Sequence, residues 1–324
     1  MITFPAVQHP RRYVWDFWYI FDAATRQYHL FYLSAETALV PLGQHHFATR
    51  LGHAVTSDFS HIDWGDGHRD HVLIPPSDHW ADAALWSGDV IQISNGYLWF
   101  FTGRRRHQDD GMTQAIGMAY SPDLTSDRWQ VTALGISPGH GYQPKTVAGD
   151  TTFHAWRDPF LFRDQGQIYM LVAAKETDAP LGRSGVVGLL RLKDNDVSQS
   201  QWDYLDPLVQ PRRFSEIEVP QLYQTPQGQY ELVFSCWAKH DRETAIAPTG
   251  GLQGFSGPHW TTLSPTPYTL LAEGSGLYAC RVIPELGGEI VGFDVQRGGI
   301  RRSGIKTGWQ AVNRDFSDCW FRAA

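Results

Sequence analysis

The sequence has few cysteines, little positive charge and no metal-site motif. Its only three cysteines, Cys236, Cys280 and Cys319, are scattered and lack CxxC spacing, which argues against both a disulfide framework and a zinc knuckle. The formal net charge of −7 argues against a nucleic-acid partner, because such proteins carry a basic footprint. The short basic run at 103–107 is interpreted as a solvated loop.

Long apolar runs are also missing. No stretch approaches the roughly 20 apolar residues that span a bilayer, so no membrane partner is expected. Residues 1–13 contain no apolar core of a signal peptide, which favours a reduced, cytoplasmic location. The paired histidines His45 and His46 and the "HRDH" run at 68–71 lack the helical spacing of a zinc motif and are interpreted as solvated loop residues. We therefore expect no metal and no cofactor, and the sequence does not indicate an oligomeric state.

What the chain does contain is material for β-structure. Aromatic residues make up 13% of its 324 residues, 13 of them Trp, and helical periodicity is almost absent. Five segments rich in β-branched and aromatic residues recur instead: 27–35, 89–103, 158–175, 219–237 and 278–295. Four of them have an apolar strand, a Gly-containing turn and a second strand, which is the pattern of a β-hairpin.

A second kind of segment follows the hairpins. Residues 52–64 and 116–129 share a small–apolar–Ser–Asp–apolar pattern with a later Trp, and 185–202 is a looser copy. Hairpin and following strands together predict a four-stranded unit that recurs at irregular intervals of about 60 residues. Five such units predict a single all-β domain over residues 1–324, a five-bladed β-propeller with an axial funnel. A β-sandwich is the alternative architecture.

Four short motifs bring polar residues to the expected strands: "VWDFW" (14–18), "LWSGDV" (85–90), "WRDPFLF" (156–162) and "EIEVPQLY" (216–223). Asp16 stands among aromatic residues, and ionised carboxylates are rarely buried without partners. Either Asp16 caps a turn, or the aromatic rings wall a pocket that uses its charge. Glu216 and Glu218 fall on one face of a strand, which is unfavourable unless a cation or a shared proton relieves the repulsion.

In this order, the four motifs resemble those of the fructosyl-processing clan that joins invertases and levansucrases (glycoside hydrolase families 32 and 68), and they are closer to family 68. The resemblance spans Val14 to Trp237. It implies a five-bladed propeller with Asp16 as nucleophile, Asp158 as transition-state stabiliser and Glu218 as general acid/base. The residues that it places around the substrate are Trp15, Trp86, Ser87, Arg157 and Glu216.

These residue types suit a retaining glycoside hydrolase or fructosyltransferase, which needs a carboxylate nucleophile and a carboxylic acid about 5–5.5 Å apart. We expect Glu216 to raise the pKa of Glu218 by repulsion and Asp16 to stay ionised. Val219 and Gln221 replace the Arg and His that are usual in family 68 and shape its substrate contacts. The sequence therefore predicts a small ketosugar conjugate as substrate. Lys239, His240 or Arg242 could enter the funnel, and spacing does not choose among them.

Two other functions remain open. The same carboxylates could eliminate water from a ketohexose-derived metabolite, which would make the protein a biosynthetic lyase. A sugar-binding propeller without catalytic activity is the third hypothesis. It would lead if Asp16, Asp158 and Glu218 lay far apart.

Overall fold

The computed structural model describes residues 4–41, 43–65, 69, 72–73, 79–105, 111–125, 129–150, 154–193, 196–197, 201–243 and 250–322. In this part of the chain the regular structure consists of strands and short 3-10 helices. The 3-10 helices are η1 (His45–Phe47), η4 (Ala238–His240), η5 (Glu273–Ser275) and η6 (Pro284–Leu286). No helix within the described residues is long and apolar enough to cross a membrane.

The strands form five antiparallel sheets, which follow the chain order except for one short C-terminal strand in the fourth sheet. The first contains β1 (Arg12–Asp22), β2 (Gln27–Glu36) and β3 (Arg50–Thr56). The second contains β4 (Ala84–Ile93), β5 (Gly96–Arg104), β6 (Gln114–Ser121) and β7 (Gln130–Ile136). The third contains β8 (Trp156–Asp164), β9 (Gln167–Lys175), β10 (Gly185–Leu192) and β11 (Trp202–Val209).

The fourth and fifth sheets complete the molecule. The fourth contains β12 (Glu218–Gln224), β13 (Tyr230–Cys236), β14 (Gly251–Gly257), β15 (Tyr268–Ala272) and the short β19 (Gln310–Ala311), which pairs with β12. The fifth contains β16 (Leu277–Ile283), β17 (Glu289–Asp294) and β18 (Ile300–Lys306).

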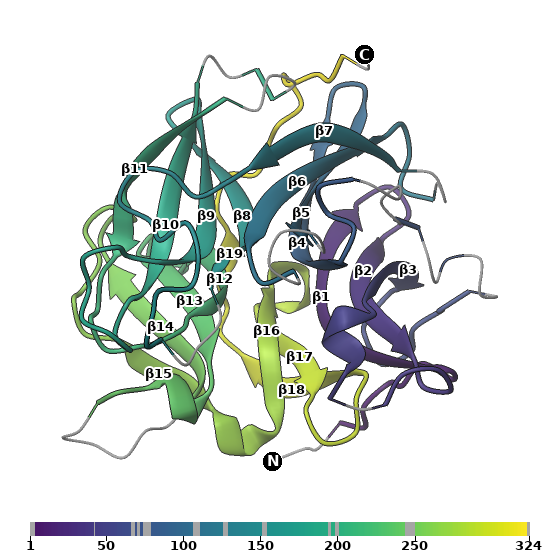
Figure 1. Cartoon of the computed structure of the whole chain (residues 1–324). Coiled ribbons are helices and arrows are strands. Elements are labelled where there is room, and N and C mark those ends of the chain that lie inside the picture. Colours follow the sequence, from purple (N-terminus) through teal and green to yellow (C-terminus); the bar gives the residue numbers. More distant parts are fainter. Residues whose placement is uncertain are drawn as a thin grey trace.

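The five sheets are blades arranged around a common axis (Figure 1). The first strand of each blade, β1, β4, β8, β12 and β16, contacts the first strand of the next blade, and β16 returns to β1. This closed ring confirms the predicted five-bladed propeller. Within the described residues, the second and third blades have four strands, the fourth has four and the short β19, and the first and fifth have three. In the fifth blade, a bridge between Val7 and Ile300 lays the N-terminal segment along β18.

The predicted hairpins are confirmed, and local sequence explains them. Gln165 and Gly166 connect β8 to β9, and both have positive φ (48° and 81°), as a two-residue type I′ turn requires. The second kind of segment supplies the third strand of the first three blades, β3, β6 and β10. Its Trp residues are buried: Trp64 and Trp129 are less than a tenth exposed.

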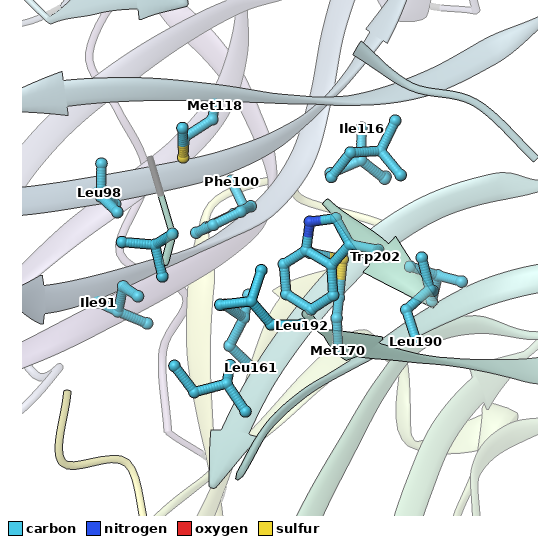
Figure 2. Close-up of a cluster of buried hydrophobic side chains, with 14 of the residues drawn as sticks. Ile91, Leu98, Phe100, Ile116, Met118, Leu161, Met170, Leu190, Leu192 and Trp202 are labelled. Carbon is cyan, nitrogen blue, oxygen red and sulfur yellow. The ribbon is translucent and has the colours of Figure 1, made fainter. Parts of the chain in front are cut away.

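The hydrophobic core lies between neighbouring blades. Figure 2 shows the cluster between the second and third blades, where side chains of β4–β6 meet those of β8–β11. Phe100 and Met118 come from the second blade, and Leu161, Met170 and Leu190 come from the third. All five are at most 1% exposed. Burial of these faces fixes the angle between blades and thereby the positions of the inner strands.

The C-terminal segment crosses one end of the ring of inner strands. β19 pairs with Tyr223 and Gln224 at the end of β12, the Arg163 N–H at the end of β8 donates to Asn313, and Phe316 bridges to the last residue of β4. These contacts lie at the C-terminal ends of the inner strands. The opposite, N-terminal ends of those strands carry the predicted site residues.

Candidate active site

Each inner strand has a β-bulge near its N-terminal end. The register shifts between Val14 and Phe17, Trp86 and Gly88, Arg157 and Phe160, Glu218 and Gln221, and Tyr278 and Arg281. A bulge interrupts the regular alternation of side chains and redirects them, which is why bulges are common beside active sites. The five shifts occur at matching places around the ring, so the residues beside them converge on the axis.

The sequence favours bulges at these positions. Pro159 and Pro220 lie within two of them, where a missing N–H interrupts no ladder hydrogen bond. Gly88 is required at a third, because a Cβ there would clash with the carbonyl oxygen of Phe100. Val219 has φ 52°, a rare conformation for a β-branched residue. Strain of this kind persists only where the surrounding structure imposes it.

A cavity of about 670 Å³ opens at this end of the ring, a size typical of ligand pockets. All eight site residues predicted from the sequence line it: Trp15, Asp16, Trp86, Ser87, Arg157, Asp158, Glu216 and Glu218. They come from four successive blades. The condition that would have favoured a non-catalytic propeller, three carboxylates far apart, is therefore not met.

Arg157 is the cation that relieves the repulsion between Glu216 and Glu218. Its Nη2 lies 2.8 Å from Glu216 Oε2 and 3.3 Å from Glu218 Oε1, and its Nε lies 3.8 Å from Asp158 Oδ2. The side chains of Arg157 and Glu216 are almost fully buried, whereas that of Glu218 is 24% exposed. A cation is one of the two expected ways of relieving the repulsion, and the effect of Glu216 on Glu218 stays a prediction.

Asp16 and Asp158 are held by hydrogen bonds from neighbouring blades. The hydroxyl of Ser87 donates to Asp16 Oδ2 at 2.5 Å. The Val219 N–H donates to Asp158 Oδ2 at 3.0 Å, and the Asp158 N–H donates to the hydroxyl of Thr102 at 3.0 Å. Ser87 is fully buried and binds the carboxylate. The sequence predicted Ser87 as a substrate-binding residue; in the structure its hydroxyl also orients Asp16.

The site concentrates negative charge in a poorly hydrated place. Burial, followed by the charge of Asp158, raises the pKa of Asp16 to about 7, against the lowering effect of the Ser87 hydrogen bond. Burial also raises the pKa of Asp158 to about 6, although Arg157 lowers it. The expectation that Asp16 stays ionised throughout is therefore wrong. A proton is retained in this cluster near neutral pH.

Sequence reasoning missed part of the aromatic wall. His45 and His46 lie on the surface loop between β2 and β3, but both rings line the cavity and contact Trp15 edge-on, with centroids 4.7 and 5.6 Å away. Trp86 Nε1 donates to the carbonyl of His46 at 2.9 Å, and the Arg104 guanidinium lies 4.3 Å from the Trp86 ring. The first two blades thus build one wall together. Of the second histidine run, His68, Asp70 and His71 lie outside the described residues.

Tyr278 and Trp237 were also missed. The Tyr278 hydroxyl donates to Glu218 Oε2, and Tyr278 precedes the bulge of β16 just as Arg157 and Glu218 precede theirs. Trp237 stacks on Tyr278 with centroids 3.8 Å apart and an interplanar angle of 13°. In the sequence, only the place of Tyr278 in the fifth repeat, which matches that of Arg157 and Glu218 in theirs, could have pointed to it. This match can be recognised only when the positions of the bulges are known.

The structure separates the three basic residues that follow Trp237. Lys239 and His240 line the cavity, whereas Arg242 lines a separate surface depression. His240 Nε2 lies 3.9 Å from Glu216 Oε2, and burial lowers the pKa of its imidazole. Gln221 does not reach the cavity, because its amide donates to the carbonyls of Val219 and Cys280 and ties β12 to β16. Within the described residues, no three His, Cys, Asp or Glu side chains are grouped to hold a metal ion.

Comparison with known proteins shows the family to which the chain belongs. The family model described as "Glycosyl hydrolases family 32 N-terminal domain" matches residues 21–286. Sucrose-6-phosphate hydrolase from Lactococcus lactis subsp. lactis is 24% identical over 178 residues, which are 55% of this chain and 33% of that protein. The chain thus spans about a third of the length of this relative.

Solved structures share the fold. The inulosucrase from Halalkalicoccus jeotgali bound to kestose superposes with a TM-score of 0.67 at 18% identity, over 91% of this chain and 79% of that one. The β-fructofuranosidase catalytic domain from Microbacterium saccharophilum K-1 gives a TM-score of 0.65 at 16% identity, over 93% and 78%. These findings confirm the resemblance drawn from the four motifs. The family match covers most of the chain, which therefore belongs to the glycosyl hydrolases of the family 32 N-terminal domain.

Proposed function

We propose that the protein is a retaining glycoside hydrolase or fructosyltransferase that acts on a small fructofuranosyl conjugate. The observation that carries this proposal is that Asp16, Asp158 and Glu218 line one cavity. They come from β1, β8 and β12, the inner strands of three blades, and Arg157 contacts both Asp158 and Glu218. A retaining mechanism requires such a carboxylate pair with a further group to hold the sugar.

Asp16 is the proposed nucleophile. Its carboxylate attacks the anomeric carbon, the bond to the leaving oxygen breaks, and a covalent glycosyl ester forms on Asp16. The hydrogen bond from Ser87 leaves one carboxylate oxygen for this attack and fixes its direction. Partial burial among aromatic rings makes the ionised form reactive, because it is poorly hydrated.

Glu218 is the proposed general acid and base. It gives its proton to the leaving oxygen, and it later takes a proton from the water or acceptor hydroxyl that cleaves the ester. Glu218 must therefore carry a proton when the substrate binds, because the leaving oxygen takes that proton as its bond to the anomeric carbon breaks. Arg157 and Tyr278 hold the Glu218 side chain in place from two sides.

The remaining residues bind and orient the sugar. Asp158 is the proposed acceptor of hydrogen bonds from two sugar hydroxyls, and the Val219 N–H and Arg157, which contact its Oδ2, hold the carboxylate in place. Trp15 and Trp86 offer flat surfaces for the apolar face of the furanosyl ring. Arg157 and Glu216 act through Asp158 and Glu218 as positioning residues.

The test is sugar release from a panel of β-fructofuranosides by the wild type, Asp16→Asn and the control Asp22→Asn. Asp22 lies on the same strand but does not line the cavity; it is partly exposed and accepts hydrogen bonds from the Ala24 N–H and the Thr25 hydroxyl. We expect free or transferred fructosyl groups with the wild type and the control, and none with Asp16→Asn. Absence of release from every donor would contradict the proposal. A product that has lost water, without free sugar, would replace it with the lyase hypothesis.

A further inference from the structure

The roles above leave one surface of the cavity without a task. Trp237 follows β13 directly, is half-buried and lines the cavity. One face of its indole ring lies on Tyr278, with 3.8 Å between centroids and 13° between planes. Tyr278 is itself held by an edge-on contact with Phe293 at 5.9 Å and by its hydrogen bond to Glu218. The indole ring is therefore held in a fixed orientation.

The position of the Trp237 ring relative to Glu218 determines which part of a substrate the ring can contact. A general acid must lie within hydrogen-bond reach of the leaving oxygen, so the leaving group has to lie on the Glu218 side of the cavity. Tyr278 contacts both Glu218 and Trp237. The Trp237 ring is thus on the Glu218 side of the cavity, where a group attached to the leaving oxygen has to lie.

The surroundings favour an uncharged, flat partner. Trp237 packs with Val219, Tyr278, Ala279 and Phe293, which are all apolar or aromatic. Three cations line the cavity: Arg157 is buried and already faces three carboxylates, whereas Lys239 and Arg297 are exposed to water. An anionic leaving group beside Glu218 would meet those three carboxylates with only Arg157 to offset them. An aromatic ring gains from stacking on the indole and from removal of its own surface from water.

We propose that Trp237 forms a leaving-group subsite for an uncharged planar aromatic group joined to the fructofuranosyl unit. This inference rests on the function proposed above and adds to it the chemical class of the conjugate. The cavity volume of about 670 Å³ leaves room for such a group beside a furanosyl ring.

The kinetic test compares benzyl β-fructofuranoside with methyl β-fructofuranoside. The two leaving alcohols have similar acidity, so a difference between the substrates reports contact with the ring. In Trp237→Ala we expect kcat/KM to fall about tenfold for the benzyl substrate and less than about threefold for the methyl substrate. Trp237→Phe should retain most of the benzyl preference. Trp320→Ala, which removes an exposed ring on the C-terminal segment, is the control and should change neither value.

Binding gives an independent readout. Asp16→Asn removes the nucleophile, so calorimetry on this variant, with and without Trp237→Ala, measures the affinity for both fructosides without turnover. Equal losses for the two ligands, no binding of either, or a wild type that prefers sucrose to the benzyl fructoside would overturn the subsite. If Asp16→Asn binds the benzyl fructoside through Trp237 but the wild type releases no sugar, the subsite stands and the proposed reaction fails.

Discussion

The carboxylates at the two ends of the inner-strand ring have opposite surroundings. At the cavity end, Asp16 lies beside other acids, and its pKa is raised to about 7, mainly by burial. At the far end, Asp89 accepts the Leu161 N–H at 2.8 Å and pairs with Arg314 at 2.7 Å. Asp89 belongs to the same short motif as Ser87, the hydrogen-bond partner of Asp16. A carboxylate with complete partners holds blades together, whereas one crowded by other acids is available for chemistry.

The C-terminal segment accounts for the difference. It brings Arg314 to Asp89 and lays backbone across the ends of β4, β8 and β12. The far end of the ring is thereby covered and its charges are paired. The cavity end keeps its opening, and its carboxylates exceed the nearby guanidinium groups.

The largest expected effect is a difference in kcat between substitutions of Asp16 and of Asp89. Asp16→Asn should lower kcat on a β-fructofuranoside by about 10⁴-fold or more while the protein stays folded, because the amide cannot form the covalent intermediate. Asp89→Asn should keep kcat within about tenfold of the wild type. Steady-state kinetics with circular dichroism on both variants tests this. Comparable losses of kcat in the two would abolish the distinction between the ends.

The next effect concerns stability at the covered end. Arg314→Met leaves Asp89 without its cation in a buried place, so we expect the free energy of unfolding to fall by about 3 kcal/mol. The control is Arg163→Met, whose partner Asp318 is 66% exposed on its side chain, and it should cost less than about 1 kcal/mol. Denaturant unfolding measures both. A loss below 1 kcal/mol in Arg314→Met would show that the pair does not hold the segment.

A smaller effect links Asp16 to pH. Because the folded-state pKa of Asp16 lies above its usual value of 3.8, the protonated form favours the fold, and this contribution is lost as the pH rises from about 4 through about 7. Asp16→Asn mimics the protonated form. It should therefore be more stable than the wild type at pH 8, by about 2 kcal/mol after allowance for partial exposure, and equally stable near pH 4.

Thermal unfolding at pH 4, 6 and 8 provides the measurement for this comparison. Asp22→Asn is again the control, and its expected change in stability at high pH has the opposite sign. Hydrogen bonds from Thr25 and Ala24 lower the pKa of Asp22, so the carboxylate stabilises the fold above the usual pKa. This variant should be slightly less stable than the wild type at pH 8. Gains of equal size at pH 4 and 8 in Asp16→Asn would exclude the linkage.

The smallest effect is a shift in the activity profile. The acid limb of kcat/KM should reflect ionisation of Asp16, so activity falls as the pH drops through about 7. Ser87→Ala removes a hydrogen bond that lowers this pKa, and the limb should move to higher pH by less than about one unit. Ser34→Ala is the matched control, since Ser34 is equally buried and bonds Arg12. If the acid limb of kcat/KM stays at the same pH in Ser87→Ala, the limb reflects the ionisation of a group other than Asp16.

Much of the architecture and the predicted residues followed from local sequence. Strand patterns and Gly-containing turns act between neighbours in the chain, so the four predicted hairpins, β4–β5, β8–β9, β12–β13 and β16–β17, are confirmed. The catalytic roles of Asp16, Asp158 and Glu218 stay predictions, although these residues do line one cavity. Family resemblance selected them, because no local rule distinguishes Asp16 from the capping carboxylate Asp22 on the same strand.

The sequence by itself therefore determined the strands, their turns and the residue types brought to the axis. Only the tertiary structure decided which groups meet there. Tyr278 reaches Glu218, Arg157 separates Glu216 from Glu218, and Trp237 lies on Tyr278, because blades distant in sequence close into a ring. Hydrogen-bond patterns of strands are local, whereas burial and electrostatic interaction depend on everything within a few ångströms in space. That dependence is why the raised pKa of Asp16 could not be predicted from the sequence around it.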